Sequence, residues 1–149
     1  MADTVRQQIR DRVITELNTD RPSSLPLVTK RRWHPGEENT SLSIAVIFLE
    51  EPTKPIGGRS GPLQDRSLHI GIQCVAGVSN RSEADDALEP ALAWATGIIG
   101  RSNLNELATE ITEINTVWEQ AKMDMFYLAA TLIFEIRYQT VRNDLFSIQ

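Results

Sequence analysis

The chain has 149 residues, of which 41% are hydrophobic and 23% charged, and its formal net charge is -5. This length fits a single domain spanning residues 1–149, with enough buried surface for a core that needs no metal or disulfide. Phosphate affinity comes mostly from Lys and Arg, so an acidic chain with one small basic cluster, residues 30–32, is not expected to recognise nucleic acid directly.

The single cysteine, Cys74, excludes an internal disulfide and fits a reducing compartment. The N-terminal residues lack the apolar core of a signal peptide. The longest apolar stretches, residues 42–49 and 125–134, are far shorter than the roughly 20 residues of a membrane helix. We therefore expect a soluble protein made in the cytosol, with no membrane partner.

The first elements follow from hydrophobic spacing and from turn residues. An apolar residue at every fourth position predicts a helix over residues 4–18, ending before Pro22. Residues 25–33 favour a short strand, and a polar turn region follows to residue 40. Residues 41–50 are apolar on both faces, which is typical of a covered, central strand.

A long connection follows over residues 51–64, with three prolines and three glycines, and it carries Lys54 and Arg59. Gly57-Gly58 is not followed by the Gly-Lys-Ser/Thr ending of a phosphate loop, so phosphate binding is not expected there. Residues 66–76 alternate cleanly and predict a strand that forms a hairpin with residues 41–50.

In the second half, residues 82–100 predict a helix that is kinked, or that restarts, at Pro90. A short turn over 104–108 precedes a strand over 109–118, and 119–125 is expected to turn. Residues 126–140 predict the last strand. The order of helix, three strands, helix and two strands indicates an α+β fold: a mixed or antiparallel sheet of about five strands, with the two main helices packed on one face.

Few residues suggest catalysis. His69 and Cys74 lie five apart on one predicted strand and so on opposite faces, which argues against a nucleophilic pair, and His69 is expected to be exposed. Neither His34 nor His69 has a nearby partner at metal-ligand spacing. Asp85 and Asp86 suit the positive end of a helix dipole better than a reaction. We therefore expect no enzyme, no cofactor and no metal.

Three patches, in this order and spacing, resemble the phage tail terminator family, which includes the U protein of lambda-like long-tailed phages. They are the Arg-led strand at residues 66–73, the Leu-x-x-Leu-Ala-x-x-Ile step at residues 104–111, and the Tyr-x-Thr strand end at residues 136–140 followed by Asp144. The resemblance covers about residues 5–144. The chain departs from the pattern at Asn105-Glu106, where glycines are expected, and at Leu145, where a proline is usual.

The resemblance implies a structural, minor tail protein of the virion. Its subunits form a homo-oligomeric ring, expected to be a hexamer, on the head-proximal end of the tail tube. The ring stops tube polymerisation and offers a surface for head-tail joining to the connector. Assembly takes place in the host cytoplasm. Such a protein binds itself, the tube protein and the connector.

Five charged residues are candidates for contacts with a neighbouring subunit or with the tube. Glu135 and Arg137 stand on the polar face of the last strand, Arg66 begins an earlier strand, and Lys54 and Arg59 lie on the long connection. Plain solvent exposure explains the charged face equally well. Two other functions also stay open: a head-completion or neck protein of the same phage class, and a small ligand-binding domain with a polar pocket near His69 and Gln73.

Overall fold

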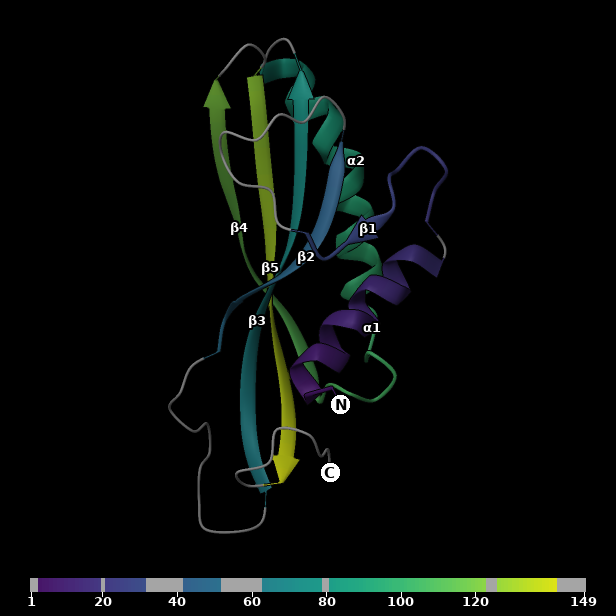
Figure 1. Ribbon diagram of the computed structural model, residues 1–149, viewed down its shortest axis with the longest axis vertical. Helices are drawn as coiled ribbons and strands as arrows, with labels where there is room; N and C mark the ends of the chain where they lie inside the picture. Colours follow the sequence, from purple (N-terminus) through teal and green to yellow (C-terminus); the bar gives the residue numbers. More distant parts are fainter. Residues whose placement is uncertain are drawn as a thin grey trace.

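The computed structural model describes residues 3–19, 21–31, 42–51, 63–78, 81–122 and 126–141. The predicted order of elements is confirmed, and the fold is α+β (Figure 1). The elements are α1 (Val5–Thr19), β1 (Val28–Thr29), β2 (Ser43–Glu50), β3 (Leu63–Val78), α2 (Arg81–Ile99), β4 (Glu110–Lys122) and β5 (Phe126–Val141).

The five strands form one mixed sheet in the order β1-β2-β3-β5-β4. β1 pairs parallel with β2, and the other neighbours pair antiparallel, including the predicted hairpin of β2 with β3. β2 lies inside the sheet between β1 and β3, as expected, and its residues 44–47 are buried on both faces; the middle position belongs to β3. β1 pairs with only Ile44 and Ala45 of β2, so the edge strand on that side of the sheet is very short.

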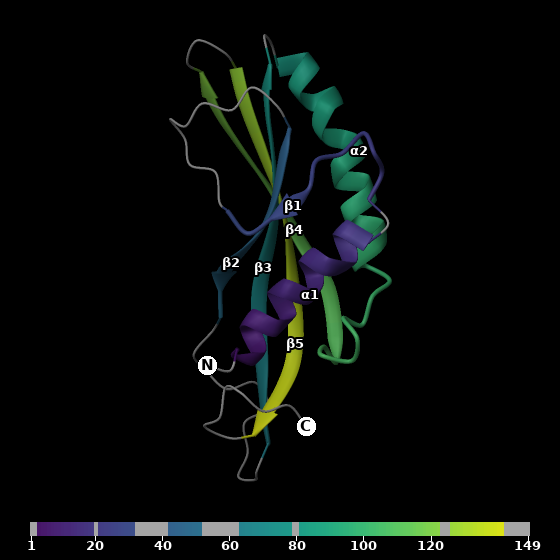
Figure 2. The ribbon, with the colours of Figure 1, turned by 45° about the vertical axis from the view of Figure 1, so that its right-hand side comes forward.

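Both helices pack on one face of the sheet, as predicted, and Figure 2 shows both on the same side of it. The fourth-residue stripe of α1 is fully buried in the same core as alternate residues of β3 and β5. Inward-facing residues of β5 are Ala130, Leu132, Phe134, Ile136 and Tyr138. This helix-covered face holds the main core, since period 2 on the strands and period 3.6 on the helices meet there.

Side chains next to the first turn stabilise the start of α1. Thr4 and Gln7 form a capping box: the Gln7 amide donates to the Thr4 hydroxyl (3.2 Å), and the Thr4 amide donates to the Gln7 side chain (2.8 Å). Of the kink or restart predicted at Pro90, the restart is wrong, because α2 continues without interruption from Arg81 to Ile99, and the kink stays a prediction. Burial of Leu88, Ala91 and Ala95 holds this helix against the sheet despite the proline.

The second face, which points away from the helices, changes character along the strands. At one end Val75, Tyr127 and Ala129 form a small buried cluster. In the middle of this face, the Thr131 methyl group packs directly against the backbone of Gly71. A Cβ added at Gly71 would lie 2.7 Å from that methyl group, which is too close. The other end carries charged side chains, so the second face is apolar at one end and polar at the other.

β3 and β5 continue beyond their neighbours as a two-stranded ribbon, made of residues 63–66 and 138–141 (Figure 1). The register of β2 on β3 ends at His69, and the register of β4 on β5 begins at Arg137. Within the described part of the chain, the ribbon therefore has no strand on either side.

Two further expectations need correction. The strand expected over 25–33 is reduced to Val28–Thr29 among the described residues. The turn expected over 119–125 is wrong for residues 119–122, which belong to β4, and residues 123–125 lie outside the described residues. The turn before β4 is confirmed. Leu104, Asn105 and Glu106 all have positive φ there (52°, 55° and 67°), a conformation that glycine adopts more easily.

Candidate functional site

The candidate interface residues Glu135 and Arg137 lie together on the second face, near the base of the ribbon. Arg137 Nε donates to Glu135 Oε1 at 3.0 Å, and its Nη1 lies 3.7 Å from Glu110 Oε2 on β4. His69 on β3 faces Glu135 in register, with Nε2 3.5 Å from Oε2. We call these four residues, which cross three adjacent strands, the Glu135 row.

The row is partly exposed and carries one unbalanced negative charge when His69 is neutral. The side chain of Arg137 is 48% exposed, whereas Glu135 is 24% exposed. Burial acts to raise the pKa of Glu135, but hydrogen bonds from Arg137 and His69 outweigh it, and the net pKa lies below its ordinary value. The expectation that His69 is merely exposed is wrong, since it is half-buried against Glu135.

We expect Glu135→Gln to flatten the acid dependence of stability. A carboxylate with a lowered native pKa stabilises the fold fully above its ordinary pKa, 4.5 here, and this contribution is lost as pH falls through the native pKa. The wild type should therefore lose stability more steeply than the variant below about pH 4.5. Denaturant unfolding at several pH values measures this, with the exposed Glu89→Gln as control; equal slopes for wild type and Glu135→Gln would contradict it.

Arg66 lies apart from this row, on the helix-covered face. It donates to Glu51 (3.3 Å) and to the Thr140 hydroxyl (2.9 Å), while the Tyr138 hydroxyl donates to the second oxygen of Glu51 (3.0 Å). Arg6 of α1 approaches the same carboxylate at 3.8 Å. We call these five residues the Glu51 cluster.

The Glu51 cluster ties α1, the end of β2 and the ribbon together. The Glu51 side chain is only 12% exposed, and burial together with its carboxylate raises the pKa of Tyr138 above its ordinary value. Three residues on which the family resemblance rests, Arg66, Tyr138 and Thr140, thus meet in one network. Sequence reasoning missed Glu51, which stood first in a Gly/Pro-rich connection and gave no signal of its own.

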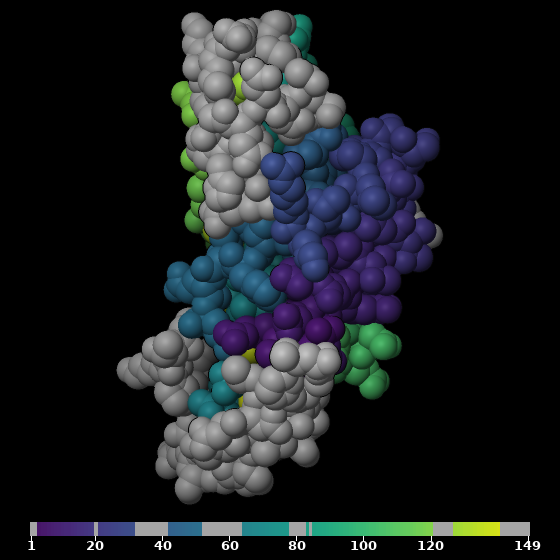
Figure 3. Space-filling view, viewed as in Figure 1, coloured from purple at the N-terminus to yellow at the C-terminus, as the bar shows by residue number. Residues whose placement is uncertain are grey.

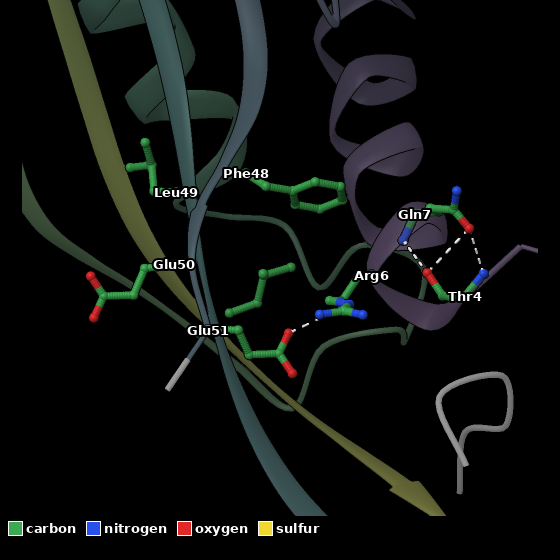
Figure 4. Close-up of a pocket in the computed structure, with 8 residues that line it drawn as sticks. Thr4, Arg6, Gln7, Phe48, Leu49, Glu50 and Glu51 are labelled. Atoms are coloured by element: carbon green, nitrogen blue, oxygen red, sulfur yellow. Dashed lines mark hydrogen bonds and ion pairs between the residues drawn. The ribbon is translucent and has the colours of Figure 1, made fainter. Parts of the chain in front are cut away.

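A pocket of about 440 Å³ adjoins this cluster between α1 and β2 (Figure 4). Arg6 points across it to Glu51, whereas Glu50 points away. Arg10 also stacks over the Phe48 ring at 4.9 Å. The lining residues are Thr4, Arg6, Gln7, Phe48, Leu49, Glu50, Glu51 and Leu68.

The other residues considered in the sequence are Lys54, Arg59 and Cys74. Lys54 and Arg59 lie outside the described residues. Cys74 is buried in the core, as expected, on the face opposite to His69, and burial raises the pKa of its thiol to about 12. Such a thiol is inert as a nucleophile.

No group of three or more His, Cys, Asp or Glu among the described residues is arranged to hold a metal ion. Neither α1 nor α2 is long and apolar enough to cross a membrane. Comparison with known proteins also leaves the family open: no protein-family model matches the chain, and a search of the curated proteins finds no match.

Proposed function

We propose that this chain is a structural virion protein that caps a phage tail tube as a ring. The ring, expected to be a hexamer, ends tube polymerisation at the head-proximal end of the tail and offers the surface to which the head connector attaches. Its partners are further copies of itself, the tube protein and the connector. Assembly in the host cytoplasm needs no substrate, cofactor or catalytic residue.

The proposal is supported first by the resemblance of residues 66–73, 104–111 and 136–140 to tail terminators. The observation that carries it furthest is the Glu135 row: helices cover one face of the sheet, and this charged row lies partly exposed near the base of the ribbon on the other face. A ring needs head-to-tail contacts between two different surfaces of each subunit. A sheet with helices on one face and charged side chains on the other has two such different surfaces. In Figure 3, α1 and residues 21–31 form a continuous surface beside β2.

We expect Arg137→Glu to abolish ring formation and tail-length control. The substitution places a third carboxylate beside Glu135 and Glu110 and reverses the charge that a neighbouring subunit would meet. Light scattering and negative-stain microscopy of the purified protein measure the rings, and tail lengths in assembly reactions measure the control of polymerisation.

Arg12→Glu is the matched control, because Arg12 is likewise an arginine that is ion-paired within the chain, with Glu16 at 3.2 Å, but lies on α1. This variant should keep its rings. If Arg137→Glu also keeps rings and tail length unchanged, the Glu135 row only faces solvent.

The two alternatives give different results. If the chain is a head-completion or neck protein, antibodies against it should label only complete particles. If it is a terminator, they should also label head-free tails. A ligand-binding domain was expected to use a pocket near His69 and Gln73, and neither residue lines the pocket beside α1. His69→Ala would abolish ligand binding in that case, whereas the proposed ring protein has no bound ligand to lose.

A further inference from the structure

The pocket between α1 and β2 has an apolar interior that the described residues leave open (Figure 4). Its volume of about 440 Å³ lies at the lower end of the roughly 300–1,000 Å³ that is usual for ligand sites. Phe48, which is 36% exposed, points from β2 toward α1 and forms one wall, and the buried Leu68 lines the pocket from β3. A pocket of this size suits a single large apolar side chain.

Arg6 gives this pocket a positive charge at its rim. Its guanidinium lies 3.8 Å from Glu51, but that carboxylate already accepts hydrogen bonds from Arg66 and Tyr138. Two arginines thus share one carboxylate, and the Arg6 side chain, which is 38% exposed, is the more accessible of the two. Glu50 points away from the pocket (Figure 4). An apolar side chain with a carboxylate beside it therefore matches both the interior and the rim.

The edge strand β4 carries side chains of this chemistry. Trp118 is 44% exposed and is the largest exposed apolar side chain of the described residues. Residues 110–121 contain three exposed glutamates and no basic residue. Glu113 lies opposite the core residue Phe134, which places Glu113 on the helix-covered face. Trp118 lies opposite the core residue Ala130 and so shares that face. An exposed tryptophan with carboxylates near it thus stands on the same face of the sheet as the pocket.

Trp118 and the pocket are too far apart to meet within one chain. Across the sheet, Phe48 and Glu113 lie in one row, three strand spacings or roughly 14 Å apart. Trp118 lies about four residues further along the sheet, which adds roughly 13 Å. An apolar projection that fits a pocket elsewhere on the same molecule makes a head-to-tail contact between copies. Because every copy carries both the projection and the pocket, the contact can repeat from subunit to subunit.

We propose that Trp118 of one copy occupies the pocket between α1 and β2 of a second copy, with a β4 glutamate beside Arg6. This inference rests on the proposed ring and names the two surfaces that join its subunits. Trp118 packs against the Phe48 ring, and such aromatic pairs are favourable beyond the area that they bury. Arg6 faces an acidic strand, which sets the orientation of the contact. Tryptophan and arginine are also the residue types on which binding energy concentrates most often.

Removal of the tryptophan tests one side of the contact. Trp118→Ala should weaken self-association at least about tenfold, because an anchor residue of this kind carries a large share of the binding energy. Val117→Ala is the matched control, since Val117 is the preceding residue and is 45% exposed but lies on the second face, opposite Thr131. Sedimentation velocity over a series of concentrations measures both. Equal losses for the two variants would contradict the role of Trp118.

A carboxylate placed in the pocket tests the other side. Phe48→Glu should also weaken association at least about tenfold, because the new charge faces the glutamates of the incoming strand and occupies Arg6. Leu27→Glu makes the same kind of change at an apolar residue that is 60% exposed but does not line the pocket, and it should associate like the wild type. Denaturant unfolding checks that both variants are folded.

A mixture of the two variants tests whether these surfaces bind each other. Trp118→Ala keeps the pocket and Phe48→Glu keeps the tryptophan, so each pair of unlike copies can form one intact contact. At high concentration, an equal mixture should form heterodimers but no rings, whereas each variant alone should stay monomeric. A mixture that also stays monomeric would show that Trp118 and the pocket are not partners.

The same variants on tail tubes separate this inference from the proposed function. If the wild type forms rings only on tubes, Trp118→Ala and Phe48→Glu should fail to form them there. Rings of both variants that match those of the wild type would overturn the contact and leave the proposed ring standing. Variants that form free rings but no longer bind tubes would also overturn it, since the pocket or Trp118 would then bind the tube. A wild-type protein that stays monomeric and leaves tubes growing would overturn both.

Discussion

Phe134→Ala should lower the free energy of unfolding by about 3–5 kcal/mol, the usual cost of emptying a large aromatic site in a core. Phe134 is 1% exposed and lies on β5, between the central strand β3 and the edge strand β4. A domain of this kind is stable by only about 5–15 kcal/mol, so the variant should lose a large share of its stability. Denaturant unfolding of the full chain measures the loss.

Ile133→Ala is the matched control for this prediction. Ile133 is the preceding residue of the same strand, is half-buried and lies on the second face. Its truncation should cost less than half as much as that of Phe134. A reversal of the two effects would mean that β5 pairs one residue out of register, because a slip of one residue exchanges the two faces.

Glu51→Ala should cost about 1–3 kcal/mol, because it leaves partly buried donors without their acceptor. The Glu51 carboxylate accepts hydrogen bonds from the Tyr138 hydroxyl and from one Arg66 nitrogen. The Arg66 side chain is only 20% exposed. Removing one partner of a sheltered charge pair costs more than the pair itself contributes to stability.

Glu50→Ala is the control for Glu51, as the neighbouring residue of the same type. Glu50 is exposed and points away from the cluster (Figure 4), so its truncation should change stability by less than about 0.5 kcal/mol. Equal effects of the two substitutions would show that the Glu51 cluster does not stabilise the ribbon.

Periodicity in the sequence predicted most of the fold. The stripe of α1 and the alternation of β5 identified the core residues because each element buries one regular face. The ends of elements were harder. β4 continues past Trp118 through Glu119 and Gln120, where a turn was expected, because an edge strand can present polar side chains on both faces.

The candidate site was predicted only in part. Alternation placed Glu135 and Arg137 on one face, and the structure brings them together with His69 and Glu110. Arg66 was grouped with them on charge alone, and the pairing of Arg66 with Tyr138 sets it on the opposite face. Contacts of this kind depend on register between distant segments, which no local pattern in the sequence records.

Electron microscopy of the purified protein mixed with tail tubes tests the central proposal most directly. We expect closed rings of the free protein at high concentration, and a ring at one end of each tube that stops further growth when tube protein is added. A strict monomer at high concentration that leaves tube ends bare and growing would contradict the proposed function.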